Sequence, residues 1–250
     1  METQLIKTQY SYEMECFAVN ENERQIEQTE VDIEAVVTTW VLTILVPLRG
    51  VNRFVEKDGL SDESVANLLG LARWLDPDDD AYSVKAARNR LRKRHQQSQV
   101  ANASRVPKVL QDNVAALQLL LGLTDIECRV LEFVVLLKTQ SALEQAGELL
   151  GDLSTDKVQR VIATILQLPE ADVRKSFSIN GVLERTGLAS IDRGGNYELY
   201  GKLDISSRAY IESLLHAGAD PMAILQHAAK PARKSSLQLS DYAHIQSMLN

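Results

Sequence analysis

The sequence predicts a mainly α-helical protein with two small helical domains, the second of which is winged-helix-like with a β-hairpin as its wing. Three observations predict this fold. Threonine or serine followed three residues later by glutamate, at residues 124–127 and 141–144, forms the capping box that begins a helix. Gly122 and Gly151 each end an apolar run and suit left-handed helix caps. The segment RGGN at residues 193–196, between two apolar stretches, predicts the turn of the hairpin.

A chain of 250 residues with 45% hydrophobic residues is long for one small helical domain, so we expect two. We place an N-terminal helical domain with one strand at residues 1–100 and the winged-helix-like domain at residues 101–205. The boundary falls in the polar, proline-ended stretch 97–107. Residues 206–250 are expected to form short helices and a linker that lead toward a missing ATPase core, for the reason given below.

The charge balance limits the classes of function. The net charge is −7 and neither half of the chain is basic, which argues against a protein whose main work is coating nucleic acid. The chain does not begin like a signal peptide, and its longest uncharged run, residues 35–48, is shorter than the ~20 residues that span a bilayer. We therefore expect a cytoplasmic protein with no membrane partner. Cys16 and Cys128 are expected as buried thiols in a reducing compartment.

The N-terminal domain is expected to form around one apolar helix. Alternation of polar and apolar residues over 9–19 predicts a half-buried strand. Residues 35–55 are apolar on nearly all sides, which places them at the domain centre, with Pro47 kinking or ending the helix. Ser61 is expected to cap the next helix, whose buried face holds the apolar residues Val65, Leu68, Leu69 and Ala72.

A basic helix follows at residues 83–97, with the sequence SVKAARNRLRKRHQQ. Two interpretations stay open: a recognition helix that contacts DNA phosphates, or a helix that is simply solvated or faces a protein partner. The aspartates of residues 76–80 offset part of its charge, which leaves residues 88–95 as a surface able to meet an acidic partner. The candidate contact residues on this helix are Lys85, Arg88, Arg90, Arg92, Lys93 and Arg94.

The second domain is expected to bury one face of a long helix, because apolar residues recur at helical spacing: Val158, Val161, Ile162, Ile165 and Leu166. Pro169 suits the first turn of the next helix, and Gly187 ends the one after it. The stretches LASID (188–192) and YELYGKL (197–203) are expected to form the wing, anchored on the long helix by the apolar residues Leu188, Ile191 and Leu199. If this module binds DNA, its candidate contacts are Lys157, Arg160 and Arg193.

Motifs for catalysis or metal binding are missing. The only Gly-Lys pair, Gly201 and Lys202, lacks the first glycine and the final hydroxyl of a phosphate-binding loop. The four histidines show no metal-ligand spacing, and no G-x-S-x-G nucleophile elbow occurs. We therefore expect no catalytic residue, no cofactor-binding residue and no metal site in this chain.

The second half of the chain resembles the region that precedes the ATPase core in a group of bacterial stand-alone AAA+ ATPases. The resemblance runs in one order over Val106–Gln246 and does not cover residues 1–100. It includes a leucine-glycine-leucine helix end, a CRVLEFVVLL helix, an LGDLS turn, an LQLPEADVR helix, a TGLASID wing and an LSDYAHI segment. These elements stand at Leu121–Leu123, Cys128–Leu137, Leu150–Ser154, Leu166–Arg174, Thr186–Asp192 and Leu239–Ile245.

The resemblance implies a non-catalytic N-terminal module that recruits a protein substrate or adaptor to an AAA+ ring. Because residues 203–250 have the composition of short helices and linkers, we expect the recruiting surface on residues 1–100. The ATPase core is absent, so no residue is carried over as catalytic. The chain would be part of a longer ATPase or the product of a split or degenerate gene. ATP and magnesium would belong to the parent ATPase. The implied partners are the AAA+ core, in cis or in trans, and further copies of the chain through the ring.

Two alternatives to this function stay open. One is a DNA-binding regulator with two helix-turn-helix-like halves, which would use the basic residues given above. The other is a purely structural domain that self-associates without any other partner.

Overall fold

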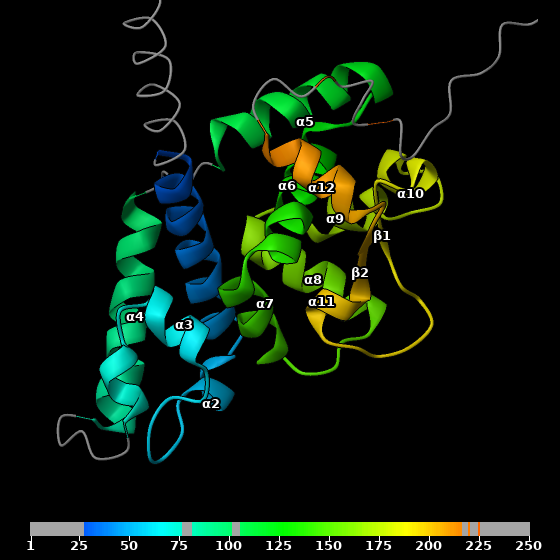
Figure 1. The fold of residues 1–250 in the computed structure, drawn as a ribbon. Coiled ribbons are helices and arrows are strands. Elements are labelled where there is room, and N and C mark those ends of the chain that lie inside the picture. The colour runs from blue at the N-terminus through cyan, green and yellow to red at the C-terminus, as the bar shows by residue number, and fades with distance from the viewer. Residues whose placement is uncertain (1–27, 77–81, 102–105, 217–219, 221–224, 226–250) are drawn as a thin grey trace, which may run out of the picture.

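The computed structural model describes residues 28–76, 82–101, 106–216, 220 and 225, which form a mainly helical fold with one small hairpin (Figure 1). The first part holds a helix over residues 28–45, α2 (Val51–Phe54), α3 (Glu63–Leu68), the 3-10 helix η1 (Ala72–Leu75) and α4 (Val84–Ala101). The second part holds α5 (Lys108–Leu121), α6 (Asp125–Thr139), α7 (Ser141–Glu148), α8 (Thr155–Leu166), α9 (Glu170–Ser176), α10 (Val182–Thr186), β1 (Ala189–Ile191), α11 (Leu199–Lys202), β2 (Leu203–Ile205) and α12 (Arg208–Leu215). The predicted strand at residues 9–19, Cys16 and the segment Leu239–Ile245 lie outside the described residues.

The helix over residues 28–45 forms the centre of the first part, as predicted. It buries Val36, Val37, Trp40, Val41, Leu42, Ile44 and Leu45. Pro47 lies in the turn that follows it, which confirms that the helix ends there. After this turn, Arg49 has a left-handed backbone with φ 63°, and the Gly50 amide donates to the Ile44 carbonyl at 3.0 Å.

The cap predicted for α3 is wrong by one residue. Asp62, not Ser61, is the N-cap, and its Oδ1 accepts a hydrogen bond from the Val65 amide at 2.7 Å. Ser61 is tied instead into the preceding turn, where its amide donates to the Phe54 carbonyl. The buried face of α3 also ends earlier than predicted. Ala72 is exposed because Gly70, at φ 58°, turns the chain before it.

Helix α6 is the centre of the second part and contacts α5, α7, α8, α9, α10, α12 and β2. The capping box at its start is confirmed: Thr124 accepts from the Glu127 amide, and the Glu127 carboxylate accepts from the Thr124 amide. The second predicted capping box is wrong. Gln140, in an extended conformation, ends α6 and also serves as the N-cap of α7, so Ser141 is already the first helical residue and its side chain caps nothing.

Most of the other helix signals of the second part are confirmed. The exception is Gly151, which is left-handed at φ 69° but lies beyond Leu149, the C-cap of α7. Gly122 and Gly187 end α5 and α10 in the left-handed conformation, and Pro169 directly precedes α9. Cys128 is buried. The five apolar residues predicted to share one face of α8 are all buried: Val158, Val161, Ile162, Ile165 and Leu166. Helix α8 is therefore packed along its whole apolar face.

The hairpin exists, but its second strand was misplaced by the sequence prediction. β1 pairs antiparallel with β2, with Ala189 opposite Ile205 and Ile191 opposite Leu203. The residues Leu199–Lys202, predicted as strand, form the short helix α11 instead. Two contacts favour the helical turn: the buried Leu199 fits against Gly147 of α7, and the buried Lys202 donates from Nζ to the carbonyls of Asp192 and Gly195.

The two parts of the fold share one hydrophobic core. Trp40 of the first helix packs edge to face against Phe133 of α6, and α3 lies against α7. On the same seam, the Arg53 guanidinium covers Gly151, so an added Cβ there would clash with Nη1. The described residues thus pack as one body, and the division into two domains and the winged-helix arrangement stay predictions.

Candidate functional site on helix α4

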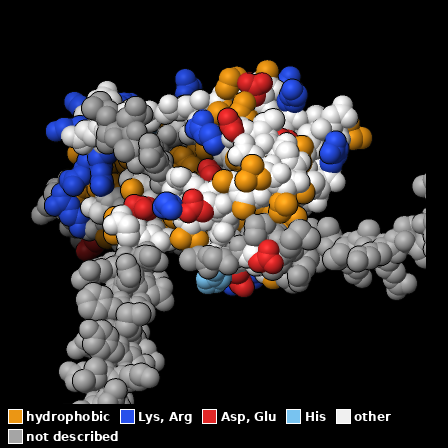
Figure 2. All heavy atoms as spheres, turned by 90° about the horizontal axis from the view of Figure 1, so that it is seen from above, with side chains coloured by type: hydrophobic (Ala, Val, Ile, Leu, Met, Phe, Trp, Pro, Cys, Tyr) orange, Lys and Arg blue, Asp and Glu red, His pale blue; other side chains and the backbone are white. Residues whose placement is uncertain are grey.

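Helix α4 holds six cations and no acid over its length of 18 residues. Lys85, Arg90, Arg92 and Lys93 are exposed, and Arg88 and Arg94 are half-buried. Figure 2 shows Lys and Arg side chains gathered at the left edge of the molecule, the side on which α4 lies in Figure 1. We call Lys85, Arg88, Arg90, Arg92 and Lys93 the α4 cationic face.

Several contacts fix α4 in place. Ala87 and Leu91 are fully buried in the core. Arg94 donates from Nη1 to the carbonyl of Leu69, the C-cap of α3, which satisfies a carbonyl at that helix end. This bond assigns Arg94 a structural role, so we leave it out of the candidate binding residues.

An aromatic side chain supports the outer side of α4. The ring of Trp74 has the guanidinium of Arg90 at 5.5 Å from its centroid and that of Arg73 at 5.4 Å. Tyr82 packs edge to face on the same ring and donates its hydroxyl to the Gly59 carbonyl at 2.7 Å. Burial is the main reason that the pKa of Tyr82 is raised.

A hollow of about 320 Å³ opens between α4 and the turn before α2. Its wall consists of Val46, Arg49, Val51, Asn52, Arg88 and Arg92. No carboxylate is among these residues, so three guanidinium groups give the hollow a strongly positive potential. The structure therefore brings two predicted residues, Arg88 and Arg92, together with Arg49 and Asn52, which the sequence prediction missed.

Two details of the hollow differ from an ordinary solvated surface. Arg49 stands at a left-handed position after a helix, where glycine or asparagine is usual and where another residue costs on the order of 1 kcal/mol. Arg88 has a buried Nε with no hydrogen-bond partner among the described residues. Buried donors are nearly always paired in folded proteins, so this one is an exception that calls for an explanation.

The three cations predicted for a DNA-reading module lie elsewhere and two of them are neutralised. Arg160 pairs with Glu170 at 3.3 Å, and Arg193 pairs with Glu184 at 3.2 Å and donates to the Phe177 carbonyl. Lys157 is exposed on α8. The hairpin stands on the opposite side of the fold from α4 (Figure 1), so the structure does not join the two predicted groups into one surface.

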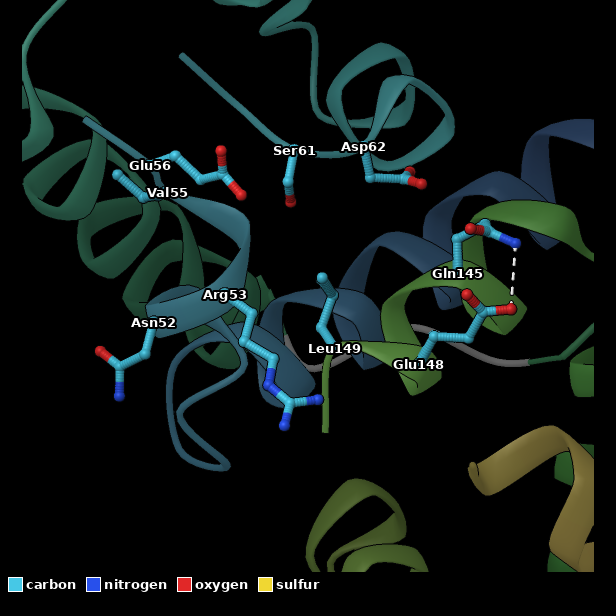
Figure 3. Close-up of a pocket in the computed structure, with 9 residues that line it drawn as sticks. All are labelled: Asn52, Arg53, Val55, Glu56, Ser61, Asp62, Gln145, Glu148 and Leu149. Atoms are coloured by element: carbon cyan, nitrogen blue, oxygen red, sulfur yellow. Dashed lines mark hydrogen bonds between the residues drawn. The ribbon is translucent and has the colours of Figure 1, made fainter. Parts of the chain in front are cut away.

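A larger hollow, of about 590 Å³, lies on the seam between the two parts of the fold (Figure 3). One side comes from the α2–α3 region, with Arg53, Glu56 and Asp62, and the other from the end of α7, with Gln145 and Glu148. Asp62 already caps α3, and Glu148 accepts from Gln145 at 3.3 Å. This larger hollow has side chains of both charges, and two of its side chains already make hydrogen bonds within the protein. It is therefore a weaker candidate than the hollow beside α4.

The buried titratable groups of α6 do not form a catalytic constellation in the described structure. Burial raises the pKa of the Cys128 thiol to about 12, so the thiol stays protonated and is a poor nucleophile. Burial also raises the pKa of Glu132 to about 7. Burial lowers the pKa of Lys138, whose Nζ lies 3.6 Å from the centroid of the Tyr200 ring and donates to the Tyr200 carbonyl.

Among the described residues, no group of three or more histidine, cysteine or acidic side chains is placed to hold a metal ion. Within the same residues, no helix has the length and apolar character needed to cross a membrane. No protein-family model, no curated protein and no solved structure matches this chain. The α4 cationic face and the hollow beside it are therefore the strongest candidates for a functional site among the described residues.

Proposed function

We propose that this chain is a non-catalytic recruiting module of an AAA+ ATPase that binds an acidic segment of a protein substrate or adaptor through the α4 cationic face. The observation that supports this most is the charge of α4. None of its five face residues makes an ion pair with an acid in the described part of the chain, although the whole protein has a net charge of −7. A cationic surface that makes no ion pair within the described part of an acidic protein favours an acidic partner by electrostatic complementarity.

The geometry of the face favours a protein segment over duplex DNA. On the side of α8 and the hairpin, Arg160 and Arg193 are paired with glutamates, so a second set of phosphate contacts is weakened. The long helix α4, supported by Trp74 and by the Arg94 bond to Leu69, offers a rigid and broad cationic surface. Such a surface can meet an extended acidic segment.

The link to an AAA+ ATPase is supported by the ordered resemblance over Val106–Gln246. In this proposal the ATPase core acts in cis or in trans, binds ATP and magnesium, and forms the ring through which copies of the module are brought together. ATP hydrolysis by the purified chain would contradict the proposal under two conditions. The activity must remain after further purification, and a point variant of the chain that still folds must lose it.

Fluorescence anisotropy with a labelled glutamate-rich peptide and a labelled DNA duplex tests the function of the face. The variant Lys85→Gln/Lys93→Gln removes two exposed charges of α4. The control Lys175→Gln/Arg185→Gln removes two exposed charges from α9 and α10. We expect the peptide to bind the wild type and the control alike, and to bind the α4 variant several-fold more weakly, with affinity falling as salt rises.

The competing proposal is a DNA-binding regulator, which would use the same α4 helix. It predicts tighter binding of the duplex than of the acidic peptide at moderate salt, with a steep salt dependence. That result would replace the recruiting proposal. Equal weakening by the α4 variant and the control would also contradict it, because the attraction would then be spread over the whole surface.

A further inference from the structure

We propose that the hollow beside α4 is a binding site for a phosphomonoester, held by Arg49, Arg88 and Arg92 with Asn52 as an additional hydrogen-bond partner. This inference goes beyond the recruiting role. It concerns a compact dianion in a defined hollow, whereas the α4 cationic face attracts an extended acidic segment. The two proposals share Arg88 and Arg92 but can fail independently.

The charge of the lining is the first argument. Among the described residues, the lining of the hollow beside α4 has three arginines and no acid. Three other hollows in the described structure each combine positive and negative side chains. The hollow on the seam has Arg53 with Glu56, Asp62 and Glu148. A hollow near the hairpin has Arg193 with Asp156, and one beside α12 has Lys138 and Arg208 with Asp204 and Glu212. Guanidinium groups present forked donors that match the oxygens of phosphate, which makes arginine the preferred residue for this task.

The shape of the hollow is the second argument. At about 320 Å³ it has room for a phosphate group and for part of the molecule that bears it. Val46 and Val51 supply an apolar wall beside the guanidinium groups, where the carbon side of an ester can lie. A site for inorganic phosphate alone would need neither this room nor this wall.

The unfavourable features of the lining are the third argument. Arg49 keeps a left-handed backbone that glycine would adopt without strain, and Arg88 keeps a buried Nε donor without a partner in the described structure. Strained residues and unsatisfied donors cluster at ligand sites, because there the ligand or its positioning gives them a use. Both residues line the same hollow. The Arg88 Nε is closed off from solvent, so a phosphate in the hollow would be held by the other guanidinium nitrogens of Arg88, and the left-handed Arg49 is the feature that a ligand explains.

The phosphomonoester can come from a small metabolite or from a phosphoserine of a protein, and the chemistry of recognition is the same. Titrations of the full chain with inorganic phosphate, phenyl phosphate, a phosphoserine peptide and the same peptide without phosphate distinguish these sources. Binding is followed by isothermal titration calorimetry, with ³¹P NMR linewidths as a second readout. We expect saturable binding of the phosphorylated probes, and tighter binding as the pH rises through about 6, where the monoester becomes a dianion.

Two variants test the assigned residues. Arg49→Gly removes a cation and at the same time relieves the left-handed backbone, so its melting temperature should equal or exceed that of the wild type. Arg92→Gln removes a second cation. Each should weaken phenyl phosphate binding roughly tenfold, as expected for the loss of one charge-assisted contact. Lys93→Gln, on the same helix but outside the hollow, should change the affinity less than twofold, the matched control.

Three results would overturn the proposal. One is the absence of saturable binding for every phosphorylated probe. Another is equal weakening by Lys93→Gln and Arg92→Gln, because diffuse attraction to α4 would then explain the binding. The last is unchanged affinity in a folded Arg49→Gly protein. If the phosphoserine peptide binds much more tightly than phenyl phosphate, the source is a phosphoprotein, and the reverse result identifies a small phosphorylated metabolite.

Discussion

The indole of Trp40 meets the ring of Phe133 edge to face, with 5.3 Å between the ring centroids and 68° between the ring planes. Trp40 belongs to the helix over residues 28–45 and Phe133 to α6, so this pair joins the first part of the fold to the centre of the second. Both side chains are buried. Edge-to-face pairs of this kind contribute about 0.5–1.5 kcal/mol beyond the burial of their area.

This contact predicts that the two parts unfold together. Both tryptophans, Trp40 and Trp74, lie in the first part, so their fluorescence reports on that part and on its contact with Phe133, whereas far-UV circular dichroism reports on all helices. Urea transitions followed by the two signals should coincide. Phe133→Leu, although it lies in α6, should shift the fluorescence transition by about 1–3 kcal/mol, and the exposed Leu119→Ala should not. A fluorescence transition well separated from the circular dichroism transition would show two independent domains.

Glu127 should be one of the most sensitive polar residues in the chain. Its buried carboxylate accepts from the Thr124 amide at 2.9 Å and from the Val182 amide at 2.7 Å, and so joins the N-termini of α6 and α10. Glu127→Ala leaves these donors unpaired and should lower the free energy of unfolding by about 2–4 kcal/mol in urea titrations. Glu212→Ala, which breaks an exposed pair with Arg208, should lower it by less than about 1 kcal/mol. Similar losses in the two variants would contradict the assigned role.

The packing of α8 predicts opposite outcomes for two neighbouring residues. Ile162 is fully buried, and Ile162→Asp places a charge in the core, so this variant should fail to fold. Arg160 is exposed and pairs only with Glu170, so Arg160→Ala should melt within a few degrees of the wild type. Thermal melts by circular dichroism check both. Equal melting temperatures would mean that the buried face of α8 is assigned incorrectly.

Glu132 should make stability depend on pH. Burial raises its pKa in the folded state to about 7, while nearby Arg129 opposes the shift. A raised pKa means that the folded state favours the protonated form of Glu132. The stabilisation of the folded state by this protonation is therefore complete below the unfolded pKa near 4.5, and it is lost as the pH rises through about 7. Glutamine at position 132 cannot ionise, so the Glu132→Gln variant does not lose stability in this way as the pH rises. It should be more stable than the wild type at about pH 8, by up to about 3 kcal/mol, with little difference at about pH 4. Parallel stability profiles from urea titrations would contradict this assignment.

Local signals in the sequence predicted most of the helices. The capping box at Thr124, the left-handed glycines and the apolar face of α8 each depend on residues within one or two turns, and all three are present in the structure. Two failures are local, because the predicted caps at Ser61 and Ser141 are each one residue from the observed N-cap. The misplaced strand of the hairpin involves contacts across longer distances. The predicted strand at residues 197–203 contains α11 because Leu199 packs against Gly147 and Lys202 bridges two carbonyls of the hairpin loop. Such contacts have no periodic pattern in the sequence.

The candidate site was predicted only in part for the same reason. The charge run of α4 is visible in the sequence, so Arg88 and Arg92 were found. Arg49 and Asn52 are about 40 residues away in the chain and join them only through the packing of α4 on the first helix. One local signal was present: Arg49 follows Pro47 and precedes Gly50, at the end of an apolar helix, where a left-handed cap is common. Without the fold, nothing linked that cap to α4.

The shared core around Trp40 and Phe133 also determines how a captured partner would be presented. Because α3 lies against α7 and Gln167 donates to Gln99 of α4, the cationic helix keeps a constant distance and direction from α12. A segment bound on α4 would therefore be delivered with a fixed orientation instead of searching the solution at the end of a loose arm. Its effective concentration at any site on the same body is set by the fold, and a single loosening substitution at this seam would lower that concentration without touching a binding residue.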